Sequence, residues 1–171
     1  LEGDIRDPKA VDEAVKGVDK VFNIAAMYRS AASVDQDYHD IHVQGTQHLL
    51  EAARHYGVER FVHCSTVGVH GDVKDPPASE TSPYAPADIY QRTKLEGELW
   101  AREYAEKHGI ALSVIRPTAI YGPGDMRLLK LFRLAVRRVT PVVGDGQIYY
   151  HMVYIDDLVQ GFLLAGERQE A

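Results

Sequence analysis

The stretch Arg60-Phe61-Val62-His63-Cys64-Ser65-Thr66 decides the fold, because it is a short apolar run that ends in two hydroxyl side chains. Its length and composition fit a strand that is buried on both faces, as the strands of a parallel sheet are. Longer amphipathic stretches on either side of it, over residues 35–56 and 88–107, predict helices. Strands that alternate with helices are typical of βα units. The sequence therefore predicts an α/β fold with a parallel sheet.

Further elements of the same two kinds lie outward from this stretch. Short apolar runs predict three more strands, over residues 20–26, 111–117 and 148–155. Amphipathic stretches predict three more helices, over residues 7–16, 126–138 and 156–165. The segment 71–86 is rich in Pro, Asp and Ser and is expected to be a surface loop, as is the stretch 121–124.

Composition and charge restrict the class of protein. A chain of 171 residues that is 45% hydrophobic and 26% charged fits one globular domain of ordinary size. Its formal net charge is -6 and its basic residues are scattered, so we expect no nucleic-acid partner. Its one cysteine, Cys64, excludes an internal disulfide. No apolar run approaches membrane-spanning length, so we expect a cytoplasmic protein without a membrane partner.

The stretch Asp88-Ile89-Tyr90-Gln91-Arg92-Thr93-Lys94 has the clearest chemistry. Asp88 fits an N-cap, and Gln91 three residues later completes the pattern of a capping box. Tyr90 and Lys94 then share one helix face, where the cation would lower the pKa of the phenol and make it usable as an acid or base. The Tyr-x-x-x-Lys motif alone is weak, because ten tyrosines in 171 residues make chance matches common.

Small and polar residues at the predicted strand ends give this motif its context. Ala25 and Ala26 end one strand, Ser65 and Thr66 end the next, and Pro117 ends a third. Ligands of open α/β sheets bind outside the carboxyl ends of the strands. We therefore expect these residues and the helix turn with Tyr90 to form one site.

Taken together, the chain resembles the extended short-chain dehydrogenase/reductase family, the NAD-dependent epimerase/dehydratase group. The motifs that match, in the order and near the spacing of the family, are Gly3-Asp4-Ile5-Arg6-Asp7, Val21-Phe22-Asn23-Ile24-Ala25-Ala26, the stretch 61–71, Tyr90-x-x-x-Lys94, Arg116-Pro117-x-x-x-Tyr121-Gly122-Pro123-Gly124 and Val153-Tyr154-Ile155-Asp156-Asp157. The resemblance implies a Rossmann-type doubly wound sheet. It also implies a nicotinamide cofactor, NAD or NADP, with NAD favoured.

The resemblance implies a role for each matching residue. Tyr90 would be the general acid/base coupled to hydride transfer, Thr66 would hydrogen-bond the reacting oxygen, and Lys94 would lower the Tyr90 pKa and hold the nicotinamide ribose. The residues implied in cofactor binding are Asp4, Ile5, Ala25, Ala26, Tyr90, Lys94 and Pro117. The residues implied in substrate binding are Thr66, Tyr121 and Tyr150.

The chain also departs from the pattern of the family. Its fourteen glycines include no G-x-G-x-x-G or G-x-x-G-x-x-G, and the first strands of the family have no counterpart. Without them the strand at 20–26 would have an unpaired edge. We therefore expect a fragment of a longer protein. Residues 1–171 would form a single incomplete NAD(P)-binding Rossmann-like domain with the first βαβ elements missing, and the substrate-binding region would begin in about 122–171.

Three departures concern the site. Val67 and Gly68 follow Thr66 where dehydratases of the group have Asp-Glu, so sugar 4,6-dehydration is not expected. Tyr150 stands where nucleotide-sugar enzymes often have an arginine that grips the diphosphate, which weakens that substrate class. His42 replaces an Asn that supports the strand beside the active site, and a ring nitrogen could serve the same purpose.

Two functions remain open. The first is an NAD(P)-dependent epimerase or dehydrogenase/reductase that acts on a secondary alcohol or ketone of a sugar or related ring, as a homodimer formed through the helices at about 35–56 and 88–107. The second is a non-catalytic dinucleotide-binding or scaffold protein. His39 and His42 are three residues apart, but no further ligand set accompanies them, so we expect no metal.

Overall fold

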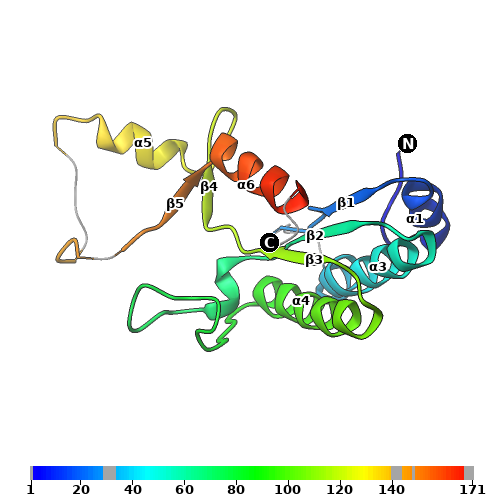
Figure 1. Cartoon of the computed structure of the whole chain (residues 1–171). Coiled ribbons are helices and arrows are strands. Elements are labelled where there is room, and N and C mark those ends of the chain that lie inside the picture. The colour runs from blue at the N-terminus through cyan, green and yellow to red at the C-terminus, as the bar shows by residue number, and fades with distance from the viewer. Residues whose placement is uncertain (1, 29–33, 140–143, 148, 168–171) are drawn as a thin grey trace.

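The computed structural model describes residues 2–28, 34–139, 144–147 and 149–167, and its helices and strands follow the predicted alternation (Figure 1). Strands β1 (Lys20–Asn23), β2 (Arg60–Cys64) and β3 (Leu112–Ile115) form a parallel sheet in the order β1-β2-β3. A separate parallel pair consists of β4 (Ala119–Tyr121) and β5 (Met152–Tyr154). The predicted α/β class with parallel strands is confirmed.

The central strand β2 is buried on both faces of the sheet, because successive side chains of a strand point to opposite faces. Phe61 packs in a core with residues of α1 (Pro8–Val15), α3 (Gly45–Tyr56) and α4 (Ile89–His108). Its neighbour Val62 packs on the opposite face against Phe162 and Ala165 of α6 (Ile155–Glu167). Figure 1 shows α6 on one side of the sheet and α3 and α4 on the other. Helices therefore cover both faces, as in a doubly wound sheet.

The predicted helix over 35–56 consists of three pieces. It begins as α2 (Asp35–His39), widens into the π-helical turn η1 (Asp40–Gln44), and continues as α3. Gly57, with a φ of 68°, ends α3 as the sequence predicts for a C-terminal glycine. Single π-helical turns occur often at functional sites, and this one carries His42.

Several elements are shorter than their apolar patterns predict. Strands β1, β2 and β3 stop before the residues expected to end them, which leaves Ala25, Ala26, Thr66 and Pro117 in the connections at the carboxyl ends of the strands. Helix α5 (Leu129–Ala135) likewise covers only the middle of its predicted range. Strand β5 covers only the later part of the predicted range 148–155, and residue 148 lies outside the described residues.

Strand β4 is an element that the sequence pattern did not predict, since Tyr121 was expected to lie in a loop. It has three residues, and it exists through pairing with β5, about thirty positions later in the chain. Thr118 strengthens this connection, because its hydroxyl donates to the carbonyl of His151 at 2.5 Å. A strand this short leaves no periodic signal.

The segment 71–86 is irregular, as predicted, and its two ends meet beside the start of α4. The Ala85 N–H donates to the carbonyl of Val69, in the 3-10 helix η2 (Val67–His70), at 3.0 Å. Gly71 has a φ of 60°, and a Cβ on it would lie 2.1 Å from the Ala85 carbonyl oxygen, so only glycine fits there. Among the described residues, no helix is both long enough and apolar enough to span a bilayer.

Candidate active site

The carboxyl ends of β1, β2 and β3 border a cavity of about 390 Å³. Its wall includes the predicted residues Thr66, Tyr90 and Pro117, together with Ala26 from the connection after β1. The other lining residues are Ile24, Tyr28, Cys64, Ser65, Val67, Gly68, Gln91, Thr118, Ala119, Ile120 and Arg127. The expected convergence of strand ends and the Tyr90 helix turn is therefore present.

Helix α4 begins just before Tyr90 because Asp88 caps it. The Asp88 Oδ1 accepts the Gln91 N–H at 2.8 Å, as the capping pattern predicts. The Gln91 side chain does not complete the predicted box, since its Oε1 accepts the N–H of Ala87 at 2.6 Å and not that of Asp88. Both bonds hold the first turn of α4 at the cavity.

Thr66 presents its hydroxyl proton to the site. It is the N-cap of η2, and its Oγ1 accepts the Gly68 N–H at 3.1 Å. The hydroxyl hydrogen is therefore available to another acceptor, and a hydrogen bond from Thr66 favours the ionised form of Tyr90. A substrate oxygen at the same place could accept that hydrogen.

Lys94 is 2% exposed and lies directly behind the cavity wall. Its Nζ donates to the carbonyl of Cys64, a lining residue at the end of β2. Burial lowers the pKa of Lys94, and Cys64 and Glu98 act in the opposite direction. The ammonium is thus held at the end of β2, one helical turn from Tyr90.

The pKa of Tyr90 differs from the expectation. Burial raises the pKa of Tyr90 to about 12, with Cys64 and Tyr28 adding to the rise and the Thr66 hydrogen bond opposing it. The predicted lowering of this pKa by Lys94 is therefore wrong for this arrangement of side chains. The physical reason is that burial of the phenol disfavours its charged form, while the Lys94 ammonium is held at the Cys64 carbonyl.

His42 joins the connection after β1 to helix α4. Its Nε2 accepts the Met27 N–H at 3.0 Å, and its Nδ1 lies 2.8 Å from the Thr93 Oγ1. The Thr93 hydroxyl donates to the Ile89 carbonyl at 2.8 Å, so the His42 Nδ1 carries the hydrogen and the ring is neutral. Burial, followed by the charge of Lys94, lowers the pKa of His42 to about 3. The expected support through a ring nitrogen is present.

Two residues of the site were not predicted from the sequence. The Tyr28 ring packs edge-on against the Tyr90 ring, with 5.2 Å between centroids, and the Arg127 guanidinium lies over Tyr28 at 5.5 Å. Both line the cavity. Tyr28 comes two residues after Ala26, which ends the predicted strand, and this position in the sequence could have indicated that Tyr28 belongs to the site. Arg127 is far away in the sequence, and only the fold places it there.

Other predicted site residues lie elsewhere. Asp4 and Ile5 line a separate cavity of about 200 Å³ beside α1 and α3, and Asp4 pairs with Arg6 at 2.6 Å. Tyr121 lines a third cavity, of about 450 Å³, with Phe132 and Tyr154. Tyr150 is 59% exposed. Ala25 is exposed next to Ala26.

The two histidines that could have suggested a metal have other partners. His39 lies 3.3 Å from the Glu96 carboxylate, and His42 makes the two bonds described above. Throughout the residues that the structure describes, no three His, Cys, Asp or Glu side chains gather as a metal site would require.

Comparisons with known proteins agree with this geometry. The sequence profile of the NAD dependent epimerase/dehydratase family matches residues 1–171. An N-acetyl-alpha-D-glucosaminyl-diphospho-ditrans,octacis-undecaprenol 4-epimerase of Escherichia coli O157:H7 is 34% identical over 161 residues, which are 92% of this chain and 48% of the relative. A 3 beta-hydroxysteroid dehydrogenase/Delta 5→4-isomerase of Mycobacterium tuberculosis is 34% identical over 176 residues, 96% of this chain and 48% of the relative.

Solved structures give the same result. The dTDP-glucose 4,6-dehydratase DesIV of Streptomyces venezuelae, crystallised with NAD, has a TM-score of 0.80 and is 32% identical to this chain. The match covers 98% of this chain and 55% of the dehydratase. The UDP-glucose 4-epimerase of Thermotoga maritima has a TM-score of 0.81 and is 29% identical to this chain. The match covers 98% of this chain and 58% of the epimerase. The chain spans about half the length of these proteins. By its profile, its fold and its strand-end site, the chain belongs to the NAD-dependent epimerase/dehydratase family.

Proposed function

We propose that this chain carries the proton-transferring part of the active site of an NAD(P)-dependent epimerase or dehydrogenase/reductase. The observation that carries the proposal is the meeting of Thr66, Tyr90 and Pro117 in one cavity at the strand ends, with Lys94 directly behind it. The proposed substrate has a secondary alcohol or ketone on a sugar or related ring. The names of the relatives, which include sugar epimerases and hydroxysteroid dehydrogenases, support this class.

The residues fit the nicotinamide end of the cofactor. Exposed Ala25 and Ala26 leave room for a flat ring beside β1, and Pro117 lies in the cavity wall. When bound, the cofactor supplies the hydride acceptor or donor. NAD is favoured over NADP, because several similar structures were crystallised with NAD. The sequence holds no glycine-rich loop for the pyrophosphate, and that part of the binding site is not assigned to these residues.

The proton moves between the substrate oxygen and Tyr90. Thr66 donates its hydroxyl hydrogen to that oxygen and holds it near the phenol. A phenol with a pKa near 12 is protonated at neutral pH, so Tyr90 is ready to act as the acid that protonates a ketone oxygen during reduction. In the opposite direction Tyr90 acts as the base, and this requires the Lys94 ammonium to stabilise the phenolate. Epimerisation uses both directions in turn.

A non-catalytic dinucleotide-binding or scaffold protein is the second candidate. The raised pKa of Tyr90 favours this candidate, because the phenol does not readily lose its proton. The bond of Lys94 to the Cys64 carbonyl also favours it, because the ammonium is not directed at the phenol oxygen. Nicotinamide fluorescence with NADH separates this candidate from the first. Binding of NADH without turnover of UDP-glucose or a 3β-hydroxysteroid by the unmodified protein would support it.

We further propose the architecture of the working protein. Residues 1–171 form a single incomplete Rossmann-like domain, and the substrate-binding region begins in about 122–171, where β4, α5 and β5 extend away from the main sheet (Figure 1). Two copies associate as a homodimer through the helices over 35–56 and 88–107.

The substitution Tyr90→Phe tests the catalytic proposal. We expect kcat to fall by about 10²–10⁴-fold, because the ring remains and only the proton donor is lost. Binding of NADH, followed by fluorescence, should stay close to that of the unmodified protein. Tyr149→Phe is the control, since Tyr149 is 85% exposed and lies outside the cavity. Turnover that is nearly normal in Tyr90→Phe would refute the assignment.

A further inference from the structure

Glu98 is a fully buried carboxylate on the same helix as the proposed catalytic pair. It follows Lys94 by one turn of α4, and the two side chains are 0% and 2% exposed. Residues four apart share a helix face, so both side chains point from α4 toward the sheet. An ionised group that is removed from water costs several kcal/mol unless it is paired, and the partners of Glu98 therefore show what it does.

Arg116 is the main partner of this carboxylate. Its Nε donates to the Glu98 Oε2 at 3.0 Å and its Nη2 to Oε1 at 2.5 Å, which makes a two-pronged pair. Arg102 approaches the same carboxylate at 3.8 Å from a side chain that is 55% exposed. Burial acts to raise the pKa of Glu98, but the hydrogen bonds from Arg116 and Ser65 and the charges of Arg116 and Arg102 together outweigh it and leave that pKa below its usual value. Glu98 is therefore ionised.

Lys94 and Glu98 fasten α4 to two neighbouring strands. Lys94 bonds to the carbonyl of Cys64 at the end of β2, and Glu98 pairs with Arg116, which directly follows β3. Cys64 and Ile115 are partners in the β2–β3 register, so both anchor points lie at the same level of the sheet. Two contacts one turn apart fix both the position and the rotation of the helix.

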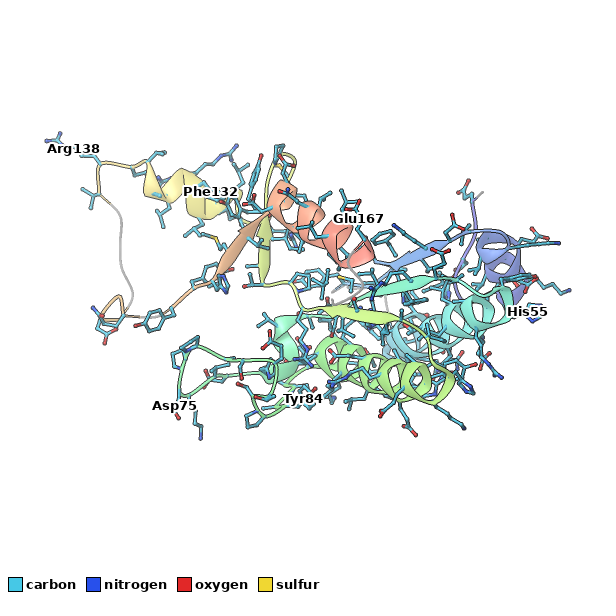
Figure 2. The ribbon with its side chains drawn as sticks, in the orientation of Figure 1. His55, Asp75, Tyr84, Phe132, Arg138 and Glu167 are labelled. Carbon is cyan, nitrogen blue, oxygen red and sulfur yellow. The ribbon has the colours of Figure 1, made fainter. Side chains whose placement is uncertain are left out.

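Arg116 also holds the segment that leads into α4. Its Nη1 lies 3.1 Å from the His70 Nε2, and its Nη2 donates to the Tyr84 hydroxyl at 2.8 Å. Figure 2 shows Tyr84 beside α4 and Asp75 at the outer part of the same segment. Since Tyr84 is followed after a few residues by the Asp88 cap, this contact also restrains the turn that carries Tyr90.

The groups that face Lys94 come from three elements. They are Tyr90 and Glu98 of α4, His63 and Cys64 of β2, and His42 of η1. Burial lowers the pKa of His63 and of His42 to about 3, and burial raises the pKa of the Cys64 thiol, so these three are neutral near pH 7. Glu98 is the ionised acid in this set, and it opposes the effect of burial on the Lys94 charge.

We propose that Glu98 is a positioning residue for the Tyr90–Lys94 pair, whose buried carboxylate, held by Arg116, keeps Lys94 protonated and fixes its turn of α4 against the strand ends. This role rests on the proposed function for its effect on turnover. The charge of Lys94 is a property of the chain itself and can be measured without substrate.

The test is an NMR titration of protein labelled with ¹³C-lysine, in which Lys94→Gln identifies the Lys94 signal. In Glu98→Gln the titration midpoint of Lys94 should fall by about one pH unit or more, a tenfold change in the protonation equilibrium. Arg102→Gln is the matched control, because it alters an exposed contact of the same carboxylate, and its midpoint should not fall. An unchanged midpoint in folded Glu98→Gln overturns the proposal.

A second variant covers the case in which Glu98→Gln leaves Arg116 unpaired and the protein unfolds. The double variant Glu98→Gln/Arg116→Met removes both charges of the pair. Loss of the Arg116 cation by itself raises the Lys94 midpoint, so Arg116→Met is the reference. The Lys94 midpoint of the double variant should lie below that of Arg116→Met, and equal midpoints would again refute the role of Glu98. Tyr90→Phe turnover distinguishes the two proposals. A shifted Lys94 midpoint together with normal Tyr90→Phe turnover refutes only the proposed function, whereas an unshifted midpoint with inactive Tyr90→Phe refutes only the role of Glu98.

Discussion

His42 is the residue whose two ring nitrogens connect the strand side of the site to the helix side. Because Nε2 accepts from Met27 and Nδ1 donates to Thr93, a second ring proton would break the bond to the Met27 N–H. His63 in β2 is also buried, and the pKa of each ring is lowered to about 3 by burial first and the Lys94 charge second. Both imidazoles are therefore neutral in the folded chain near pH 7.

This arrangement predicts a loss of stability in mild acid. The pKa of a histidine in the unfolded chain is about 6.5, so below that pH the unfolded state binds more protons than the folded state and stability falls. The loss begins near pH 6.5 and continues down to about pH 3, where the folded rings begin to titrate. Between pH 7 and pH 5 each ring should lower the free energy of unfolding by about 2 kcal/mol.

Urea unfolding of His42→Asn checks this prediction. The variant keeps a polar side chain at the position but has no proton to gain, so its loss of stability between pH 7 and pH 5 should be smaller by about 2 kcal/mol. His55→Asn, at an exposed position of α3, should keep the pH dependence of the unmodified chain. Equal pH dependence in all three proteins would contradict a neutral, buried His42.

At the scale of elements, the contact between α4 and the π-helical turn η1 determines how closely the Tyr90 helix approaches His42. Gly97 of α4 lies against this turn, and a Cβ on Gly97 would come within 2.3 Å of the His42 carbonyl oxygen. That oxygen is already fixed, since it accepts the Thr46 hydroxyl at 2.8 Å. A methyl group at residue 97 would therefore push the two helices apart.

We predict that Gly97→Ala lowers the free energy of unfolding by about 1–3 kcal/mol, although alanine is the better helix former by about 1 kcal/mol. Gly161→Ala in α6 is the matched control, because nothing lies within 4 Å of its added Cβ. That variant should be as stable as the unmodified chain or more stable by up to about 1 kcal/mol. Thermal and urea unfolding give both values, and a stabilised Gly97→Ala would show that the contact is looser than described.

The elements that the sequence predicts well are those with a local signal. The apolar run at 60–66 and the Asp88 cap are local patterns, and both appear as β2 and the start of α4. Strand β4 depends on a partner far along the chain, and the π-helical turn leaves no mark in an amphipathic pattern. The pKa of Tyr90 was wrongly predicted, because the spacing of Tyr90 and Lys94 does not reveal that the ammonium bonds to a carbonyl of β2.

At the scale of the whole molecule, α4 has one face on the sheet and another directed outward. The outward face includes Leu99, which is 44% exposed. Beside it, the Trp100 ring stacks on Tyr104 with 4.6 Å between centroids and packs partly against the core around Phe61. Large apolar side chains on an exposed helix face are typical of association surfaces. This surface lies on the helix that carries Tyr90, so a dimer formed there would also support the site.

The proposed homodimer predicts a specific effect of charge at Leu99. Leu99→Glu should convert a dimer into a monomer at micromolar concentration, because a carboxylate buried in an apolar interface costs several kcal/mol without a partner. Leu131→Glu is the control, since Leu131 in α5 is equally exposed, at 44%, but lies outside the proposed interface. Multi-angle light scattering measures the masses. If the unmodified protein is a monomer, the homodimer is excluded. If the dimer persists in Leu99→Glu, the two copies associate through another surface. In either case the helix with Tyr90 would have to be held by Lys94, Glu98 and the cap at Asp88 alone.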